Sequence, residues 1–396
     1  MDQWTELISQ EFQYVLLLFV LFVLPRALQR FRLPAAISCV GLGALAGIGL
    51  GLFREDAAVN LLSTFGIVSL FLFAGLDVES SELRRNGSFL LQHLVIRIVA
   101  LALLTVAISL IVEMPIQPAV LLALALTTPS TGFILDSLGS LGVSDHERSW
   151  IKSKAIATEL VALAILFLAL QPMTVRQVLT SVLILGAMVA FLPFVFRLFA
   201  NVLLPHAPKS EFAFLLMVAV VCALVTRQLG AYYLVGAFVV GLAAQRFREQ
   251  LPALASEQMV HAVEVFASFF VPFYFFHAGV RLQAENFTSA AIGLGIGLLV
   301  VLVPLRVGLV AIHRSLALGE STRGGVRIGM AITPTLVFTL VIAEILQERF
   351  ALSPVLFGGL VVYTLLNTLL PSFFLRLPPD DLEHLVAPPV PVDETT

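Results

Sequence analysis

The chain has 396 residues, of which 59% are hydrophobic and 12% are charged, and its mean hydropathy is +0.99. This composition is typical of an integral membrane protein and excludes an ordinary water-soluble domain. The formal net charge of −3 argues against a nucleic-acid partner.

The apolar segments are long continuous runs rather than alternating strands of about ten residues, which favours a helical bundle over an outer-membrane barrel. Cys39 and Cys222 both fall in such runs, so no disulfide framework is implied. Residues 1–11 are polar and acidic and lack a basic region. We therefore expect the first apolar run to be a retained helix and not a cleaved signal.

A membrane-spanning helix needs about 20 apolar residues. By this criterion the sequence predicts an all-α polytopic membrane protein, a single domain over 1–377 with about thirteen transmembrane helices. The predicted helices are 11–29, 34–53, 60–78, 88–112, 117–138, 150–171, 175–203, 211–229, 231–246, 260–282, 288–314, 322–347 and 352–376. The proline-rich, acidic tail, 378–396, is predicted to be disordered.

Basic residues favour the cytoplasmic side of a membrane. With the N-terminus outside, the inner loops and helix ends carry Arg26, Arg30, Arg32, Arg84, Arg85, Arg148, Lys152, Lys154, Arg197, Lys209, Arg246, Arg248, Arg314, Arg323, Arg327 and Arg376. The outer ends carry Arg54, Arg176, Arg227, Arg281 and Arg349. This ratio of about three to one predicts an external N-terminus and a cytoplasmic C-terminus. The short loops and compact length favour a bacterial inner membrane.

One sequence pattern occurs twice. The stretch 127–131 (Thr-Thr-Pro-Ser-Thr) lies in the middle of one apolar segment and 333–335 (Thr-Pro-Thr) in the middle of another, with their prolines 205 residues apart. By the helix count the two copies lie an odd number of crossings apart and face opposite ways. The repeat halves are about 60–171 and 260–376. An inverted repeat with a broken helix in each half is typical of a secondary transporter.

Charged residues and prolines converge on one predicted depth. Glu159 lies about nine residues into its predicted helix, and at 1.5 Å per residue this is ~14 Å into a hydrocarbon core of about 30 Å. The same estimate puts Arg97, Arg306, Pro129 and Pro334 at a similar depth. An ionised group there is costly unless it is paired or faces water. Glu159 is therefore either the structural partner of an arginine or a carboxylate that binds a proton and a cation in turn.

The two arginines permit more than one interpretation. Arg306 keeps its charge and is expected to balance charge by holding either Glu159 or freed backbone carbonyls. Arg97 is expected to pair with Asp136 or Glu264, or to extend into a cavity.

Pro129 and Pro334 each remove a backbone donor and interrupt their helix. Carbonyls freed at membrane depth need new partners. The hydroxyls able to take up some of this role are those of Thr128, Ser130, Thr131, Thr333 and Thr335. The simpler alternative is a pair of kinked helices without a binding role.

No Walker motif, dinucleotide fingerprint or nucleophile elbow is present in the sequence. We therefore expect no enzyme activity, no cofactor and no nucleotide partner. An ion gradient is the remaining energy source for transport.

Several motifs, in order and spacing, resemble the monovalent cation/proton antiporter-2 family. They are Leu-Phe-Ala-Gly-Leu-Asp at 72–77, the interrupted stretch at 127–131, Gly-Ala-Phe-Val-Val-Gly-Leu at 236–242 and Phe-Val-Pro-Phe-Tyr-Phe-Phe-His-Ala-Gly at 270–279. The similarity covers about residues 10–376. Bacterial sodium/proton and potassium/proton exchangers belong to this family.

The resemblance implies a thirteen-helix homodimer with a dimerisation domain and a core domain that moves like an elevator. In the core, 117–138 and 322–347 would form two crossed, discontinuous helices. The family's ion-binding pair corresponds here to Thr158 and Glu159, and its basic residue before the second broken helix corresponds to Arg306.

The sequence departs from the family pattern at two places. Thr158 and Glu159 stand where the family has Asn-Asp or Asp-Asp, which leaves one carboxylate and one hydroxyl. The second broken helix often contains Gly-Glu, whereas 333–335 is uncharged and the next acid is Glu344.

The sequence thus predicts an electroneutral exchange of sodium or potassium for protons. The expected ion and proton ligands are Glu159, Thr158, Thr128, Ser130, Thr131, Thr333 and Thr335, and no other metal site is expected. Two alternatives remain open: an ion-coupled carrier of a small anion held by Arg97 and Arg306, and a non-transporting sensor or scaffold derived from an antiporter.

Overall fold

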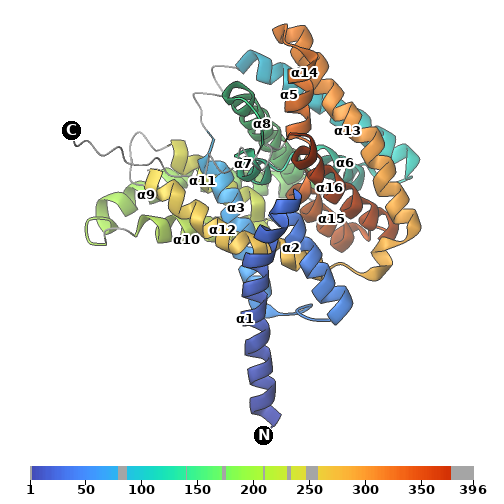
Figure 1. Cartoon of the computed structure of the whole chain (residues 1–396). Helices are drawn as coiled ribbons and strands as arrows, with labels where there is room; N and C mark the ends of the chain where they lie inside the picture. Colours follow the sequence, from blue (N-terminus) through green and yellow to red (C-terminus); the bar gives the residue numbers. More distant parts are fainter. Residues whose placement is uncertain are drawn as a thin grey trace, which may run out of the picture.

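The computed structural model describes residues 2–78, 87–139, 141–171, 175–207, 210–229, 233–246 and 257–375. The regular structure of these residues is helical, without a β-strand (Figure 1). The predicted tail, 378–396, lies outside the described residues. So do five of the basic residues behind the predicted orientation, Arg84, Arg85, Lys209, Arg248 and Arg376.

The helices follow the predicted apolar segments along the chain. They are α1 (Asp2–Leu28), α2 (Ala35–Ala44), α3 (Ala57–Leu76), α5 (Gly87–Ile111), α6 (Ile116–Thr127), α7 (Thr131–Leu138), α8 (Asp145–Ala169), α9 (Val175–Leu198), α10 (Glu211–Gln228), α11 (Tyr233–Arg246), α12 (Glu257–Val280), α13 (Ser289–Leu318), α14 (Thr322–Ala331), α15 (Leu336–Phe350) and α16 (Pro354–Phe374). Each predicted segment overlaps one helix or one broken pair.

Within the described residues, nine helical spans are long and apolar enough to cross a membrane, or ten if the bent pair α14–α15 is one span. The chain is therefore a multi-pass membrane protein. The helices α2 and α11 are short and α8 carries many charges, which keeps them out of this set. That thirteen spans cross the bilayer stays a prediction.

Polar side chains fix where many of these helices begin. Asp56 accepts a hydrogen bond from the N–H of the third residue of α3, and Thr288, Ser321 and Ser353 do the same for α13, α14 and α16. Ser144 forms a reciprocal capping box with Glu147 at the start of α8. Such caps satisfy amide groups that the first turn leaves unpaired.

The described helices form two bundles. The first contains α1, α2, α3 and α9 to α12, with α3 packed along α11 and α12. The second contains α5 to α8 and α13 to α16, with α13 packed along α14 and α16. The bundles adjoin chiefly where α3 meets α7 and α11 meets α8. In Figure 1, α9, α10 and α12 lie to the left, and α5, α13 and α15 to the right.

Glycines allow the closest approach inside the first bundle. A Cβ added to Gly75 of α3 would meet the carbonyl of Phe238 in α11, and one added to Gly241 of α11 would meet the carbonyl of Leu72 in α3. The two backbones therefore pack directly against each other, as small residues permit in membrane helices.

The two interrupted segments cross at their breaks. The break between α6 and α7 spans residues 128–130, and that between α14 and α15 spans 332–335, where the pair is bent by 49°. The N–H of Ser130 donates to the carbonyl of Pro334 at 2.9 Å, and the Ser130 hydroxyl accepts from the N–H of Val337 at 3.0 Å. The expected crossing of two broken helices is therefore present.

The same order of elements occurs twice in the chain. A helix of the first bundle (α3, then α12) is followed by a helix, a broken pair and a helix of the second bundle. The interpretation of 60–171 and 260–376 as inverted repeat halves remains a proposal.

Candidate functional site

Glu159 is the acid at the crossing of the broken helices. It lies on α8 and is 1% exposed, and it is the only buried acid among the side chains whose exposure is described. Its Oε2 accepts a hydrogen bond from the backbone N–H of Thr131, the first residue of α7, at 2.9 Å. An anion is favoured there because the first amides of a helix have no internal acceptor and carry its positive dipole end.

Glu159 faces the junction of the two bundles. It shares a narrow hollow with Ser130 and Gly132 beside the first break, with Val337 of α15 and with Leu70, Phe71 and Ala74 of α3. The hollow is too narrow to hold a water molecule. The Thr131 hydroxyl is buried nearby and makes no hydrogen bond of normal geometry with a described residue. An unpaired buried oxygen beside a carboxylate is a candidate ligand for a hard cation or a proton.

Arg306 of α13 holds carbonyl oxygens of both breaks. It is buried, and it donates to the carbonyls of Thr333 at 2.9 Å, Ile332 at 3.1 Å and Leu126 at 3.4 Å. It also donates to the hydroxyl of Tyr363 at 3.0 Å, which in turn donates to the Leu126 carbonyl at 2.8 Å. Of the two sequence interpretations, the structure selects carbonyl binding over a contact with Glu159.

Arg97 of α5 serves the first break alone. Its Nη2 donates to the carbonyl of Thr127 at 2.6 Å, at the last residue of α6. Pairing with Glu264 is wrong, because Glu264 lies 3.5 Å from His261 on the exposed face of α12. The side chain of Asp136 lies outside the described residues. Arg97 lines a cavity, as one of the alternatives expected.

Thr158 and Glu159 point into different spaces. Thr158 lines the Arg97 cavity together with Thr128, whereas Glu159 lines the hollow beside α3. The Thr158 hydroxyl donates to the carbonyl of Lys154 at 2.7 Å and lies 3.4 Å from Nε2 of His93. Neighbouring helical residues point about 100° apart. The expectation that these two side chains form one ion site therefore does not hold in this conformation.

The hydroxyls of the second break are engaged within the protein. Thr333 donates to the carbonyl of Met330 at 2.7 Å. Thr335 Oγ1 accepts from Thr339 Oγ1 at 2.7 Å and lies 3.1 Å from Thr364 Oγ1. These bonds hold α14, α15 and α16 together, so Thr333 and Thr335 act as packing groups in this conformation.

Asn367 of α16 plays the part in the second half that Glu159 plays in the first. Its Oδ1 accepts from the N–H of Thr335 at 3.3 Å, and its Nδ2 donates to Thr335 Oγ1 at 3.0 Å. The sequence interpretation missed Asn367 and Tyr363. The 205-residue offset between the prolines could have found this region, because it carries Glu159 onto Thr364.

A buried basic cluster was also missed. His93 of α5, Lys154 of α8 and Arg314 of α13 are each at most 1% exposed. The Arg314 guanidinium lies 4.6 Å from the centre of the Trp150 ring and pairs with Glu320. The clue in the sequence is Lys154, which lies four residues before Thr158 and thus on the same helical face.

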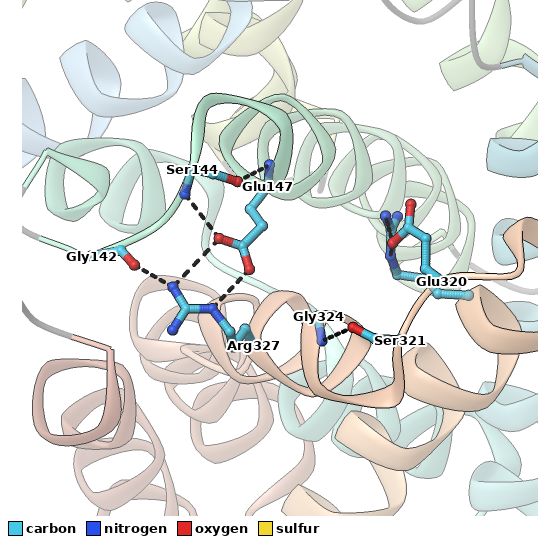
Figure 2. Close-up of polar contacts among 8 residues, drawn as sticks. Gly142, Ser144, Glu147, Glu320, Ser321, Gly324 and Arg327 are labelled. Carbon is cyan, nitrogen blue, oxygen red and sulfur yellow. Dashed lines mark hydrogen bonds and ion pairs between the residues drawn. The ribbon is translucent and has the colours of Figure 1, made fainter.

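The beginning of α8 is tied to α14 (Figure 2). Arg327 Nε lies 2.8 Å from Glu147 Oε1, and Arg327 also donates to the carbonyl of Gly142. Burial raises the pKa of the Glu147 carboxyl, but hydrogen bonds from Arg327 and Ser144 outweigh it and hold that pKa below its ordinary value. This salt bridge therefore links the two halves of the second bundle at the beginning of α8.

Comparison with solved structures shows a known fold. The sodium proton antiporter MjNhaP1 from Methanocaldococcus jannaschii at pH 8 superposes with a TM-score of 0.66 at 13% identity, covering 93% of this chain and 96% of that one. A second structure of the same antiporter, from electron microscopy, gives a TM-score of 0.63.

Curated relatives are named as antiporters. The Na(+)/H(+) antiporter of Enterococcus hirae is 22% identical over 88% of this chain and 92% of its own length. A probable Na(+)/H(+) antiporter 3 of Methanocaldococcus jannaschii is 29% identical, but the match spans only 20% of either protein. The match to antiporter NhaS5 of Synechocystis is 25% identical and spans 40% of that relative.

Residues 15–377 match the sequence profile described as sodium/hydrogen exchanger, transmembrane, which is most of the chain. This match agrees with the family resemblance found in the motifs and with the crossed, broken helices around Glu159. The chain belongs to the family of transmembrane sodium/hydrogen exchangers.

Proposed function

We propose that the protein exchanges sodium for protons at Glu159. The observation that carries this proposal is the position of one buried carboxylate at the crossing of two interrupted helices, facing the junction between the bundles. Family membership and the names of the relatives support sodium and the proton as the exchanged ions. Ser130 and Thr131 are the proposed oxygen ligands beside Glu159. The proposed role of Thr128, Thr158, Thr333 and Thr335 is to support the structure around this site.

The proposed stoichiometry is one sodium ion for one proton. Both terminal nitrogens of Arg306 donate to carbonyls and to Tyr363, and the hydrogen bonds of the described residues include none between Arg306 and Glu159. Glu159 then carries either one sodium ion or one proton, and the moving bundle keeps the same charge in both directions. Exchange would be electroneutral.

The proposed movement is a displacement of the second bundle, the core, against the first. The bundles adjoin over few helices, and the Glu159 hollow lies between them. The first bundle is proposed to form the homodimer interface in a bacterial inner membrane, with the N-terminus outside and the C-terminus inside. Chemical cross-linking of the purified protein in liposomes tests the dimer, and labelling of single cysteines from either side tests the orientation.

The function is tested with purified protein in liposomes carrying a pH-sensitive dye. Sodium, potassium and lithium salts are added separately, with choline as the blank. Wild-type protein is expected to move protons in response to sodium. Glu159→Gln should abolish this response, and Glu264→Gln, which removes an exposed acid, should retain it. Sodium-driven proton movement near the wild-type rate in Glu159→Gln would reject the assignment.

The same assay separates the alternatives. A small-anion carrier would respond to a change of anion at constant sodium. A non-transporting sensor would give no proton movement with any salt.

A further inference from the structure

The cavity beside Arg97 is separate from the Glu159 hollow. It lies between α5, α6 and α8, has a volume of about 30 Å³ and is lined mainly by apolar side chains. A volume of this size has room for roughly two water molecules. The polar groups at its wall are Arg97, Thr127, Thr128 and Thr158.

Arg97 has N–H groups beside this cavity that donate no hydrogen bond to a described residue. The side chain is 9% exposed and makes one hydrogen bond, from Nη2 to the Thr127 carbonyl. Among the described residues its Nε and Nη1 have no acceptor, and no carboxylate pairs with it. The Thr128 hydroxyl, at the same wall, also makes no hydrogen bond with a described residue. An acceptor bound in the cavity could therefore pair with donors of both side chains.

The local charge favours an acidic occupant. Arg97 and Arg306 are both buried near the breaks, whereas Glu159, the buried carboxylate of the described residues, faces the other hollow. A cation at membrane depth is costly unless it is paired. A carboxyl group in the cavity would supply the missing acceptor for Arg97.

The cavity opens on a lipid-facing surface. Ile98 at its wall is 44% exposed, and Leu94 and Leu101 beside it are half-buried. The outer face of α5 continues as an apolar strip with Leu91, Val95 and Leu103 each more than half exposed. A ligand arriving through this face comes from the hydrocarbon region and needs an apolar body.

We propose that this cavity binds the carboxyl group of a single-chain fatty acid from the bilayer. The carboxyl group would accept hydrogen bonds from Arg97 and Thr128, and the acyl chain would lie along Leu94, Ile98 and Leu101. The cavity has room for the three heavy atoms of a carboxyl group, and its mainly apolar lining suits a ligand with one small polar end.

The proposal does not depend on ion exchange, because binding needs neither a gradient nor Glu159. A bound fatty acid would nevertheless affect ion exchange, because the Arg97 guanidinium that holds its carboxyl group also donates to the Thr127 carbonyl at the end of α6.

The experiment measures thermal unfolding of the full chain in detergent with lauric acid, with dodecanol as the carboxyl-free match, and with choline chloride. A diazirine-bearing fatty acid is cross-linked in parallel, and the labelled peptides are mapped. Ile98→Trp fills the mouth of the cavity without touching Arg97. Leu103→Trp adds the same bulk at another exposed position of α5, away from the cavity, and serves as its control.

Lauric acid should raise the melting temperature more than dodecanol does, and cross-links should fall on α5. Arg97→Gln should weaken binding about tenfold or more, because a charge-assisted hydrogen bond is lost. Ile98→Trp should abolish the shift, and Leu103→Trp should keep it.

Three outcomes would overturn the proposal. They are an equal shift with dodecanol, a shift with chloride alone, and an undiminished lauric acid shift in Ile98→Trp. If Arg97→Gln does not fold, the two tryptophan variants decide the matter. Loss of exchange in Glu159→Gln with lauric acid binding intact would show that the two sites fail separately.

Discussion

Glu159 Oε2 accepts a hydrogen bond from the backbone N–H of Thr131 at 2.9 Å, so the acid of α8 caps the second half of a helix broken within the membrane. In the other half of the chain, Asn367 Oδ1 accepts from the N–H of Thr335 at 3.3 Å and caps α15 in the same way. One cap can be charged and the other cannot. This asymmetry separates a group that can exchange ions from one that only supports the helix.

The two caps should respond differently to substitution. In Glu159→Gln the side-chain oxygen can still accept from Thr131, so the melting temperature should stay near that of the wild type while exchange is lost. Asn367→Leu removes the acceptor for Thr335 and should lower the free energy of unfolding by about 1–3 kcal/mol, the cost of one unpaired buried amide.

The measurements are the melting temperature in detergent and sodium-driven proton movement in liposomes. Asn367→Leu should retain exchange at temperatures well below its melting point. Equal losses of stability in both variants, with exchange unaffected in either, would show that Glu159 is only a cap.

Glu159→Asp should weaken sodium binding without abolishing exchange. The shorter side chain keeps its charge but withdraws the carboxylate by about one methylene, so the bond to the Thr131 N–H is lost. A carboxylate drawn back from the proposed ligands Ser130 and Thr131 should raise the sodium concentration for half-maximal exchange about tenfold. A titration with sodium in liposomes measures it, with Glu264→Asp as the matched surface change. An unaltered half-maximal concentration would mean that the Thr131 contact has no part in binding.

Arg306→Met should destabilise the crossing of the broken helices. It leaves the carbonyls of Ile332 and Thr333 without a side-chain donor, at about 1–3 kcal/mol for each group left unpaired. Arg306→Lys keeps the charge but cannot reproduce the planar fork, so it should be intermediate. In detergent, the melting temperature should be highest for the wild type, lower for Arg306→Lys and lowest for Arg306→Met. A melting temperature for Arg306→Met equal to that of the wild type would contradict the role assigned to this residue.

The salt bridge between Glu147 and Arg327 should make the stability of the protein depend on pH in the acid range. The carboxyl lies in the first turn of α8, before the predicted apolar segment 150–171, and its pKa in the folded protein is below the ordinary value. Its stabilising effect is therefore fully present above the unfolded pKa of about 4.3 and is lost as pH falls through the lower folded pKa.

The measurement is the melting temperature of wild-type protein and of Glu147→Gln at several pH values. The wild type should be the more stable protein at neutral pH, and the difference should shrink in acid. A difference that is constant down to the lowest pH would assign the effect to packing. Asp145→Gln, a neighbouring change outside this contact, is the control.

The sequence by itself determined the membrane class, the order of the helices and the two interruptions. A span needs a long apolar run, and a proline interrupts a helix wherever it stands, so both features can be found locally along the chain. Glu159, Arg97 and Arg306 were found for the same reason, because a charge in an apolar segment is conspicuous whatever it contacts.

Only the tertiary structure decided what these groups contact. Arg306 binds carbonyls from both breaks, and Thr158 turns away from Glu159, because each direction depends on how α8 and α13 are rotated about their axes against their neighbours. That rotation comes from packing between distant segments. Asn367 and Tyr363 escaped notice for a related reason: neutral side chains in an apolar helix show no local signal, and their role exists only where α16 meets the crossing.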